Sequence, residues 1–265
     1  MNPPVKLLAL DLDGTLLDPG GIILDEVRAA LGVAAQRGIA VVIATGRPLK
    51  DTLGFLAKSR FALADGFPHA LIIEGREIFL LGKSGYEPMR EWNEASVGRC
   101  QAVLPMAQGL LAEACAWCAG RGLGHKRVPP EVETARKVAV AFFETVAGAE
   151  AALGWLRGEI AQRGAPLQAG RNVHVIGVGP DALGKGITLR RLIERLGVEP
   201  SSVLAIGDTQ NDEDMLDGGY GYQCGTTANA EEAIKALVRG RGGPIASLPY
   251  GRGVLEILKA TGCSA

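Results

Sequence analysis

The chain has 265 residues, of which 47% are hydrophobic and 22% are charged, so it can bury a sizeable core and differs from a disordered chain. Its net charge of −1 gives no reason to expect general binding to nucleic acids or to a membrane surface. We find no signal peptide at the amino terminus and no apolar stretch that would span a bilayer, and therefore expect a cytoplasmic protein.

The first predicted element is a strand over residues 6–10, an apolar run that ends in Asp11, Asp13 and a turn at Gly14. Two carboxylates at the end of a hydrophobic strand raise the free energy of the fold unless a cation or a proton neutralises them. The carboxyl end of a strand is also where open α/β sheets bind ligands. The alternative is an acidic turn that caps a helix.

A βαβ unit follows. A helix capped by Asp25 and ending at Arg37 places apolar residues on one face, namely Val27, Leu31 and Ala34. The strand over residues 40–44 comes next, and we expect it to pair in parallel with the first strand. Further along, we expect a helix over 49–59, a strand over 70–73 and a hairpin partner over 77–81.

The pattern changes between residues 83 and 180. Helices are expected over 107–121 and 149–163, and strands over 137–145 and 172–178, which suits a small α+β domain with helices on one face of a sheet. The earlier pattern resumes with a helix over 188–196 and a strand over 203–206. We therefore predict an α/β protein: a doubly wound, Rossmann-like core (residues 1–82 and 181–265) with an inserted α+β domain (residues 83–180).

Three of the predicted strands end in polar side chains, which should meet at one edge of a parallel sheet. They are Asp11 with Asp13, Thr45, and Asp208 with Asn211 and Asp212. Four carboxylates favour a hard divalent cation, and Mg²⁺ is the plausible one. Lys185 would balance an anionic substrate.

These residues resemble the four motifs of the haloacid dehalogenase superfamily of phosphohydrolases. Asp11-Leu-Asp13-Gly-Thr15 matches the first motif, and Thr45-Gly-Arg47 the second. Lys185 within Gly-Lys-Gly matches the third, and Gly207-Asp208-x-x-Asn211-Asp212 the fourth. The motifs stand in the order of the family.

The resemblance implies a role for each matched residue. Asp11 would attack phosphorus to form an aspartyl phosphate, and Asp13 would serve as general acid and then base. Mg²⁺ would be held by Asp11, the backbone carbonyl of Asp13, and Asp208, while Asp212 would hold a metal-bound water or orient the lysine. The phosphoryl oxygens would be bound by four residues: Thr45, Gly46, Lys185 and Asn211.

The position of the inserted domain, between the second and third motifs, is typical of the C2-capped class and resembles its Cof-type, or IIB, branch. That resemblance implies a cap that closes over a small phosphorylated metabolite, a sugar phosphate above all. Where the branch usually has Asn-Gly, this chain has Glu74-Gly75. Arg47, Arg171 and His174 are candidate substrate contacts; otherwise the arginines are solvated and the histidine is structural.

Other interpretations remain open. A phosphomutase shares the aspartyl phosphate but returns the phosphoryl group to a second position on the substrate. A response-regulator receiver also gathers Asp, Thr and Lys around Mg²⁺, although it is about half this length. Cys115 and Cys118 match C-x-x-C, but no second pair completes a zinc set, so we interpret them as buried helical residues. The residues before Lys185 nearly spell a P-loop, but Gly186 stands where Ser or Thr should be.

Overall fold

The computed structural model describes residues 3–264, apart from the side chains of residues 130, 135 and 136. The chain forms two compact units. The first, which we call the core unit, comprises the chain up to Asn93 together with the chain from Gly184 onward. The second, the inserted unit, is Glu94–Leu183.

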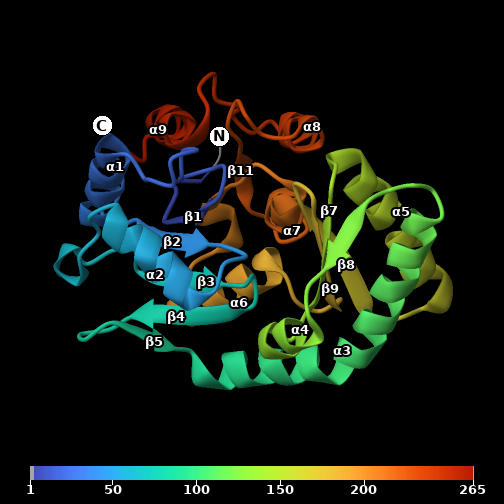
Figure 1. The fold of residues 1–265 in the computed structure, drawn as a ribbon. Helices are drawn as coiled ribbons and strands as arrows, with labels where there is room; N and C mark the ends of the chain where they lie inside the picture. Colours follow the sequence, from blue (N-terminus) through green and yellow to red (C-terminus); the bar gives the residue numbers. More distant parts are fainter. Residues whose placement is uncertain (1–2, 265) are drawn as a thin grey trace. The chain divides into compact units, whose positions relative to one another are not determined.

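The core unit is built on a mainly parallel sheet (Figure 1). Over the described residues its seven strands follow the order β11 (Gln223–Gly225), β10 (Val203–Ile206), β1 (Leu7–Asp11), β2 (Ala40–Ala44), β3 (Ala70–Ile73), β4 (Glu77–Leu81) and β5 (Tyr86–Pro88). The first five strands in this order are parallel, and β4 and β5 add an antiparallel edge. The prediction of a doubly wound, parallel sheet is confirmed.

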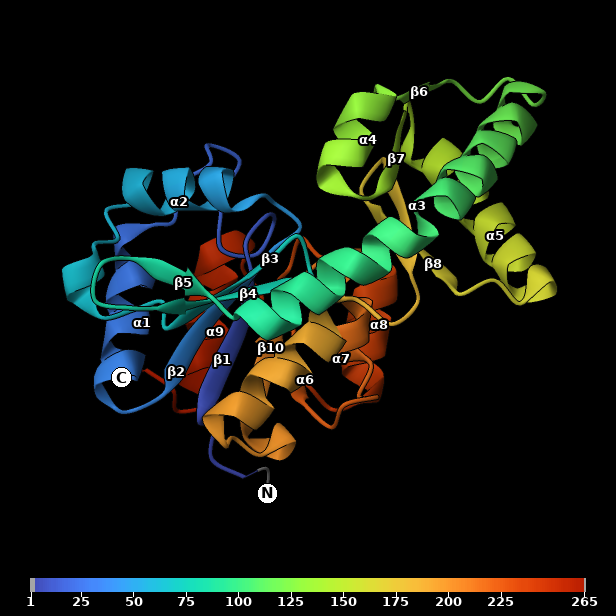
Figure 2. The ribbon, with the colours of Figure 1, turned by 90° about the horizontal axis from the view of Figure 1, so that it is seen from below.

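Helices cover both faces of this sheet, which explains why its strands read as continuous apolar runs. Along β1, Leu8 and Leu10 pack in the layer with α1 (Asp25–Gln36), α2 (Leu49–Lys58) and α9 (Tyr250–Ala260). Leu7 and Ala9 point into the layer formed with α6 (Lys185–Leu196), α7 (Glu213–Leu216) and α8 (Glu232–Gly240). Figure 2 shows the same sheet from below, with helices on both sides. Single turns of 3₁₀ helix occur at η1 (Leu63–Asp65), η2 (Pro200–Ser202) and η3 (Gln210–Asp212).

The inserted unit is an antiparallel sheet with helices. Its strands follow the order β6 (His125–Arg127), β7 (Ala139–Phe143), β9 (Val175–Pro180) and β8 (Leu167–Asn172). Residues of α3 (Arg90–Ala119) and α5 (Val146–Arg163) pack with one face of this sheet, and α4 (Pro130–Arg136) lies between β6 and β7 in the sequence. Cys115 and Cys118 are buried in this core with free thiols, as expected.

Three local predictions are wrong. The single strand expected over 172–178 is a hairpin, because the chain turns at Val173 and His174 between β8 and β9. The helix expected to begin at residue 107 begins at Arg90 and continues through Pro105. Asp25 does not cap α1: Leu24 is the N-cap, and Asp25 lies in the first turn, where its charge suits the helix dipole.

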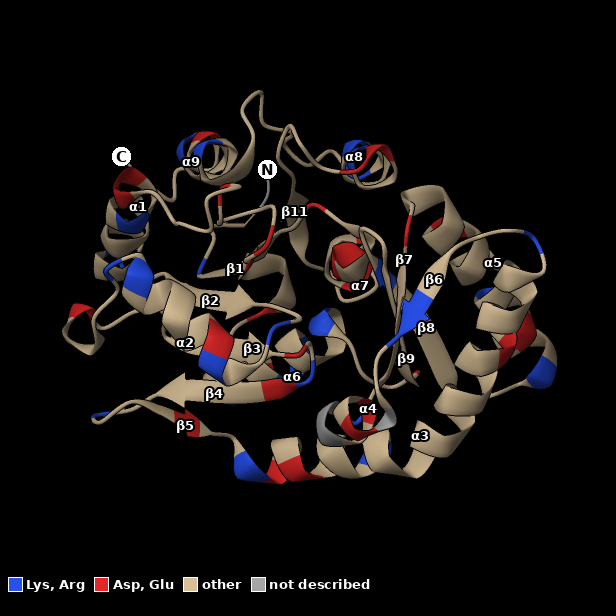
Figure 3. Ribbon diagram, viewed as in Figure 1, with Lys and Arg blue, Asp and Glu red and all other residues tan. Residues whose placement is uncertain are grey.

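The expectation that no segment has the length and composition to cross a bilayer also needs correction. Among the described residues, α3 is long and apolar enough by these two criteria. Its apolar residues nevertheless include Leu110, Leu111 and Ala114, which are buried in the core of the inserted unit. Figure 3 shows acidic and basic residues interspersed along both units, in keeping with the small net charge.

Candidate active site

The register of the sheet brings the motif residues to one edge. Asp11, the last residue of β1, lies opposite Ala44 of β2, so Thr45 follows directly beside it. On the other side, Leu10 lies opposite Ile206 of β10, so Gly207 and Asp208 follow at the same level. The predicted convergence of these strand ends is present in the structure.

Three buried carboxylates form the centre of this edge. One oxygen from each of Asp11, Asp208 and Asp212 lies within 4.8 Å of the other two. Asp208 Oδ1 accepts a hydrogen bond of 2.9 Å from Thr15 Oγ1. Asp212 Oδ2 accepts from the backbone N–H of Asp208 at 3.0 Å and from that of Thr209 at 3.2 Å. The side chain of Asp212 is therefore held by its own loop, and that of Asp208 by the loop that follows β1.

Lys185, the first residue of α6, is the cation of this cluster. Its Nζ atom lies 2.5 Å from Asp11 Oδ1 and 2.6 Å from Asp212 Oδ1, and its side chain is only 3% exposed. Gly75 brings the loop after β3 against this lysine, since a Cβ atom at that position would lie 3.7 Å from Lys185 Cγ. Three carboxylates and one ammonium leave two negative charges in excess when all are ionised.

The electrostatics show that this excess is unfavourable. Burial, followed by the charge of Asp212, raises the pKa of Asp208 to about 7. Burial also raises the pKa of Asp11 well above its usual range, with further contributions from Asp212 and Asp208. Burial alone would lower the pKa of Lys185, but the charges of Asp11 and Asp212 outweigh it and raise that pKa. The cluster thus favours uptake of a positive charge.

The donor set fits a divalent metal ion. Asp11 Oδ2 is buried and has no hydrogen-bond partner in the part of the chain that the structure describes. Carboxylate oxygens are the ligands that Mg²⁺ prefers, and a 2+ ion would balance the two excess charges. Of the predicted metal residues, the structure brings together Asp11, Asp208 and Asp212. The side chain of Asp13 is not part of this group, and the prediction for Asp13 concerned its backbone carbonyl.

Asp13 is paired with Arg47 instead. Arg47 Nε lies 2.7 Å from Asp13 Oδ2, and Arg47 Nη2 lies 2.6 Å from Asp13 Oδ1. The guanidinium also stacks over Phe55, with 4.5 Å from Cζ to the ring centroid. Its hydrogen bond to Asp13 raises the pKa of Arg47. Arg47, predicted as a substrate contact, is thus engaged by the predicted acid–base residue.

The residues predicted to bind the phosphoryl group lie on the adjoining loops. Thr45 is fully buried, and its Oγ1 accepts from the backbone N–H of Arg47 at 3.1 Å. Gly46 is exposed, and the space around its Cα is open. Asn211 Oδ1 accepts a hydrogen bond of 2.6 Å from Thr209 Oγ1. Their role in phosphate binding stays a prediction.

Two of the candidate substrate contacts belong to the inserted unit. Arg171 is buried; its Nη1 donates to the backbone oxygen of Val173 at 2.6 Å, and its Nη2 lies 3.6 Å from Glu150. His174 is exposed in the β8–β9 turn, and its backbone oxygen accepts from Phe143 N–H. It is therefore a turn residue and not the strand residue that we expected. Contact of either residue with a substrate stays a prediction.

The departure from the family pattern at Glu74 has a structural counterpart. Glu74 adopts a left-handed conformation with φ of 50°, which asparagine tolerates better than glutamate. Its carboxylate forms an ion pair with Arg76, and its backbone N–H donates to the carbonyl of Arg47. The backbone N–H of Gly75 donates to the carbonyl of Thr45 at 2.9 Å. This loop is therefore tied to the second motif.

Sequence reasoning missed several supporting side chains. Thr15 was quoted in the first motif but was given no role, although it binds Asp208. Thr188 Oγ1 donates to the carbonyl of Gly75 at 2.9 Å. Asp214 Oδ2 accepts from the backbone N–H of Gly186 at 2.7 Å, and burial raises the pKa of Asp214 to about 6. Each is a single polar residue whose partner is distant in sequence, so spacing carried no signal.

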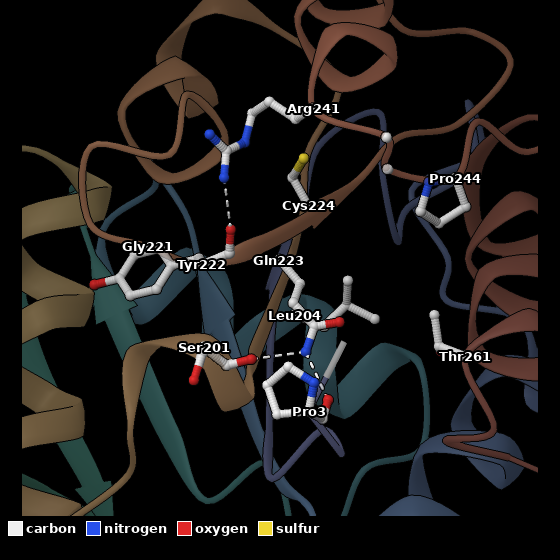
Figure 4. A pocket seen from close by; sticks show the side chains of 12 residues that line it. Pro3, Ser201, Leu204, Gly221, Tyr222, Gln223, Cys224, Arg241, Pro244 and Thr261 are labelled. Carbon is white, nitrogen blue, oxygen red and sulfur yellow. Dashed lines mark hydrogen bonds between the residues drawn. The ribbon is translucent and has the colours of Figure 1, made fainter. Parts of the chain in front are cut away.

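A cavity of about 210 Å³ lies elsewhere in the core unit (Figure 4). It is lined by residues where β10 and β11 begin, including Leu204 and Gln223, whereas the acidic cluster follows the end of β10. Gln223 Nε2 donates to the carbonyls of Pro3 and Ser201, and Arg241 Nη2 donates to that of Tyr222. Its lining includes none of the motif residues, so this cavity is not the candidate active site.

Comparison with known proteins agrees with the geometry. The family profile of haloacid dehalogenase-like hydrolases matches residues 8–66 and 133–239, which is more than half of the chain. Phosphatase YwpJ of Bacillus subtilis is 26% identical over 269 residues, covering 88% of this chain and 93% of that protein.

Two solved structures share the fold over nearly the whole chain. The sucrose-phosphatase of Synechocystis sp. PCC6803, solved with sucrose and phosphate, aligns with a TM-score of 0.72 and 18% identity, covering 98% of this chain and 99% of that one. The subclass IIB sugar phosphatase BT4131 aligns with a TM-score of 0.65 and 18% identity, covering 98% and 100% of the two chains. From the family match, the acidic cluster and this fold, we conclude that the chain belongs to the haloacid dehalogenase-like hydrolases.

Proposed function

We propose that the protein is a Mg²⁺-dependent phosphatase that hydrolyses a small phosphorylated metabolite through an aspartyl phosphate on Asp11. The observation that carries this proposal is the environment of Asp11. One of its oxygens is held by Lys185, while the other is buried without a hydrogen-bond partner among the described residues. A carboxylate oriented in this way has one oxygen available for attack.

In the first half-reaction, Asp11 Oδ2 attacks the phosphorus atom, and the bond from phosphorus to the ester oxygen breaks. Asp13 gives its proton to the leaving alkoxide. In the second half-reaction a water molecule attacks the phosphorus, Asp13 accepts a proton from that water, and the bond between phosphorus and Asp11 breaks. The sum is one alcohol and one phosphate from an ester and a water.

The surrounding side chains supply charge and position. Lys185 orients Asp11 and would place a positive charge beside the phosphoryl oxygens. Stabilisation of negative charge on these oxygens is the main contribution to catalysis of phosphoryl transfer. Mg²⁺ bound by Asp11, Asp208 and the backbone carbonyl of Asp13 would screen the repulsion between the nucleophile and an anionic ester. Arg47 orients the ionised form of Asp13, the form that accepts a proton from the water in the second half-reaction, by its two-pronged contact. We assign Thr45, Gly46 and Asn211 to the phosphoryl oxygens.

We infer a sugar phosphate as the substrate class. This rests on the two solved relatives of the same fold, a sucrose-phosphatase and a sugar phosphatase. We assign the inserted unit, predicted over residues 83–180 and bounded at Glu94–Leu183 in the structure, as a C2-type cap that selects the substrate. Arg171 and His174 are its candidate contacts, and we place the chain in the Cof-type branch. A cytoplasmic location is part of the same proposal.

The test is phosphate release from p-nitrophenyl phosphate and from a panel of sugar phosphates, with and without EDTA. Asp11→Asn should abolish release while leaving the circular dichroism spectrum unchanged, and EDTA should silence the wild type. Asp25→Asn is the matched control, since Asp25 is exposed, pairs with Arg60 and lies outside the acidic cluster. Retained activity in Asp11→Asn would rule out the assigned nucleophile. An isomerised sugar phosphate in place of free phosphate would point to a phosphomutase.

A further inference from the structure

One short segment after β11 contacts two loops of the candidate active site, the loop after β1 (residues 12–17), which we call the first loop, and the loop after β10 (residues 207–212). We call residues 226–231 the brace segment. Thr226 Oγ1 donates to the carbonyl of Gly207 at 2.7 Å, and the backbone N–H of Glu231 donates to the carbonyl of Asp208 at 2.9 Å. Asn229 Nδ2 donates to the carbonyl of Gly14 at 2.8 Å. Two strand-end loops that are distant in sequence are thus fastened to one segment.

Asn229 is the residue of the brace segment that reaches the first loop. Its Oδ1 accepts from the backbone N–H of Tyr250 at 2.8 Å and from Thr227 Oγ1 at 3.0 Å, which fixes the orientation of its amide. The remaining donor, Nδ2, then points to the carbonyl of Gly14. Because Tyr250 is the first residue of α9, Asn229 joins the first loop to the start of that helix.

The position of Gly14 matters because its backbone lies against Asp208. Gly14 has a φ of 83°, and a Cβ atom there would lie 2.2 Å from Asp208 Oδ2. A shift of this backbone therefore disturbs the Asp208 carboxylate directly. It also moves the preceding peptide, which contains the carbonyl of Asp13.

We propose that Asn229 is a positioning residue that sets the distance between the first loop and Asp208, and with it the affinity for Mg²⁺. The predicted effect on catalysis rests on the proposed function, whereas the predicted effects on the first loop and on Mg²⁺ affinity can be tested without it. Loss of a side chain that hydrogen-bonds a metal ligand typically costs about 10- to 100-fold in metal affinity or activity. Asn229 acts one residue further out, through the backbone of Gly14, so we expect an effect at the lower end of this range.

Two variants remove the contact in different ways. In Asn229→Asp the acceptor for Tyr250 and Thr227 remains, but the donor to Gly14 is lost. In Asn229→Ala all three contacts are lost and no charge is added. The control is Ser247→Ala, which removes the bond of Ser247 Oγ to Glu256, a residue of α9, and leaves both loops untouched.

Three measurements follow on each variant: Mg²⁺ binding by calorimetry without substrate, hydrogen exchange of the amides of Leu16 and Leu17, and steady-state kinetics. Both amides donate to the carbonyl of Leu12 and so report on the first loop. We expect Mg²⁺ binding about 10-fold weaker and faster exchange in both Asn229 variants, with kcat lowered about 10-fold and partly restored by excess Mg²⁺. Ser247→Ala should match the wild type.

The proposal is overturned if both Asn229 variants bind Mg²⁺ within twofold of the wild type and exchange at the wild-type rate, even if their melting temperatures fall. It is also overturned if only Asn229→Asp changes, because the added charge would then be the cause. A wild type that releases no phosphate would refute the proposed function, while exchange at Leu16 and Leu17 would still decide whether Asn229 holds the loop.

Discussion

Asp208→Asn is predicted to stabilise the protein in the absence of metal while removing its ability to bind Mg²⁺. Asparagine keeps an oxygen for the hydroxyl of Thr15, so the local hydrogen bond survives. It removes one of the carboxylates of the cluster and with it part of the repulsion between Asp208 and Asp212. We therefore expect Asp208 to lower the stability of the metal-free protein even though it is needed to bind Mg²⁺.

The magnitude follows from the pKa of Asp208, which burial and the charge of Asp212 raise to about 7, whereas aspartate in an unfolded chain has a pKa near 4. One pKa unit corresponds to about 1.4 kcal/mol, so ionised Asp208 lowers the free energy of unfolding by about 4 kcal/mol. Below about pH 4 the residue is protonated in both states and this loss is absent. The loss grows as the pH rises toward 7 and is constant above it.

The assay is urea unfolding of the metal-free protein, in EDTA, at pH 4 and at pH 8. Asp208→Asn should match the wild type at pH 4 and exceed its free energy of unfolding by about 4 kcal/mol at pH 8. Added Mg²⁺ should stabilise the wild type and leave Asp208→Asn unchanged. Asp25→Asn, at an exposed position, serves as the control for loss of one negative charge.

A variant that is no more stable than the wild type at pH 8, or that keeps the same dependence on pH, would refute this reasoning. Asp208 would then be ionised without penalty in the folded protein, and the cluster would have no excess charge for a metal ion to balance.

Three further substitutions test neighbouring contacts. Lys185→Met keeps a linear side chain but leaves Asp11 and Asp212 without their cation. We expect the free energy of unfolding, measured with urea at pH 8, to fall by about 3–5 kcal/mol and kcat to fall by at least about 100-fold. A variant that stays stable and active would contradict the account. Arg47→Lys replaces a two-pronged contact with a single one, so kcat should fall about 10-fold with unchanged Mg²⁺ affinity in calorimetry; wild-type turnover would show that Asp13 needs no such partner. Asp13→Asn should lower kcat by about 100- to 10,000-fold, less with p-nitrophenyl phosphate than with an alkyl phosphate, since nitrophenolate leaves without a proton; an equal loss on both substrates would exclude an acid role.

Much of the core unit could be predicted because its signals are local. A strand buried on both faces has to be a short apolar run, so β1, β2, β3 and β10 were found with errors of a residue or so at their ends. Once these strands are parallel, their carboxyl ends must share an edge. The meeting of Asp11, Thr45 and Asp208 follows from topology alone.

The missed features depend on contacts between distant residues. The early start of α3 was not predicted because the helix continues through Pro105, a residue type that normally interrupts a helix. The β8–β9 turn was not predicted because it lies at Val173 and His174, a pair without the glycine or proline that usually marks a turn. Nothing in the spacing indicated that Arg47 would bind Asp13, or that Asn229 would bind Gly14. Side chains that support a site from outside its motifs carry no periodic pattern.

The central claim is that the phosphoryl group passes through the carboxylate of Asp11. Its most direct test is to acid-quench the wild-type enzyme during turnover with Mg²⁺ and to locate the phosphoryl group by peptide mass spectrometry. The account predicts a phosphorylated peptide that carries the group on Asp11, and none after EDTA treatment or in Asp11→Asn. Turnover with the group on another residue, or an active Asp11→Asn variant, would contradict it.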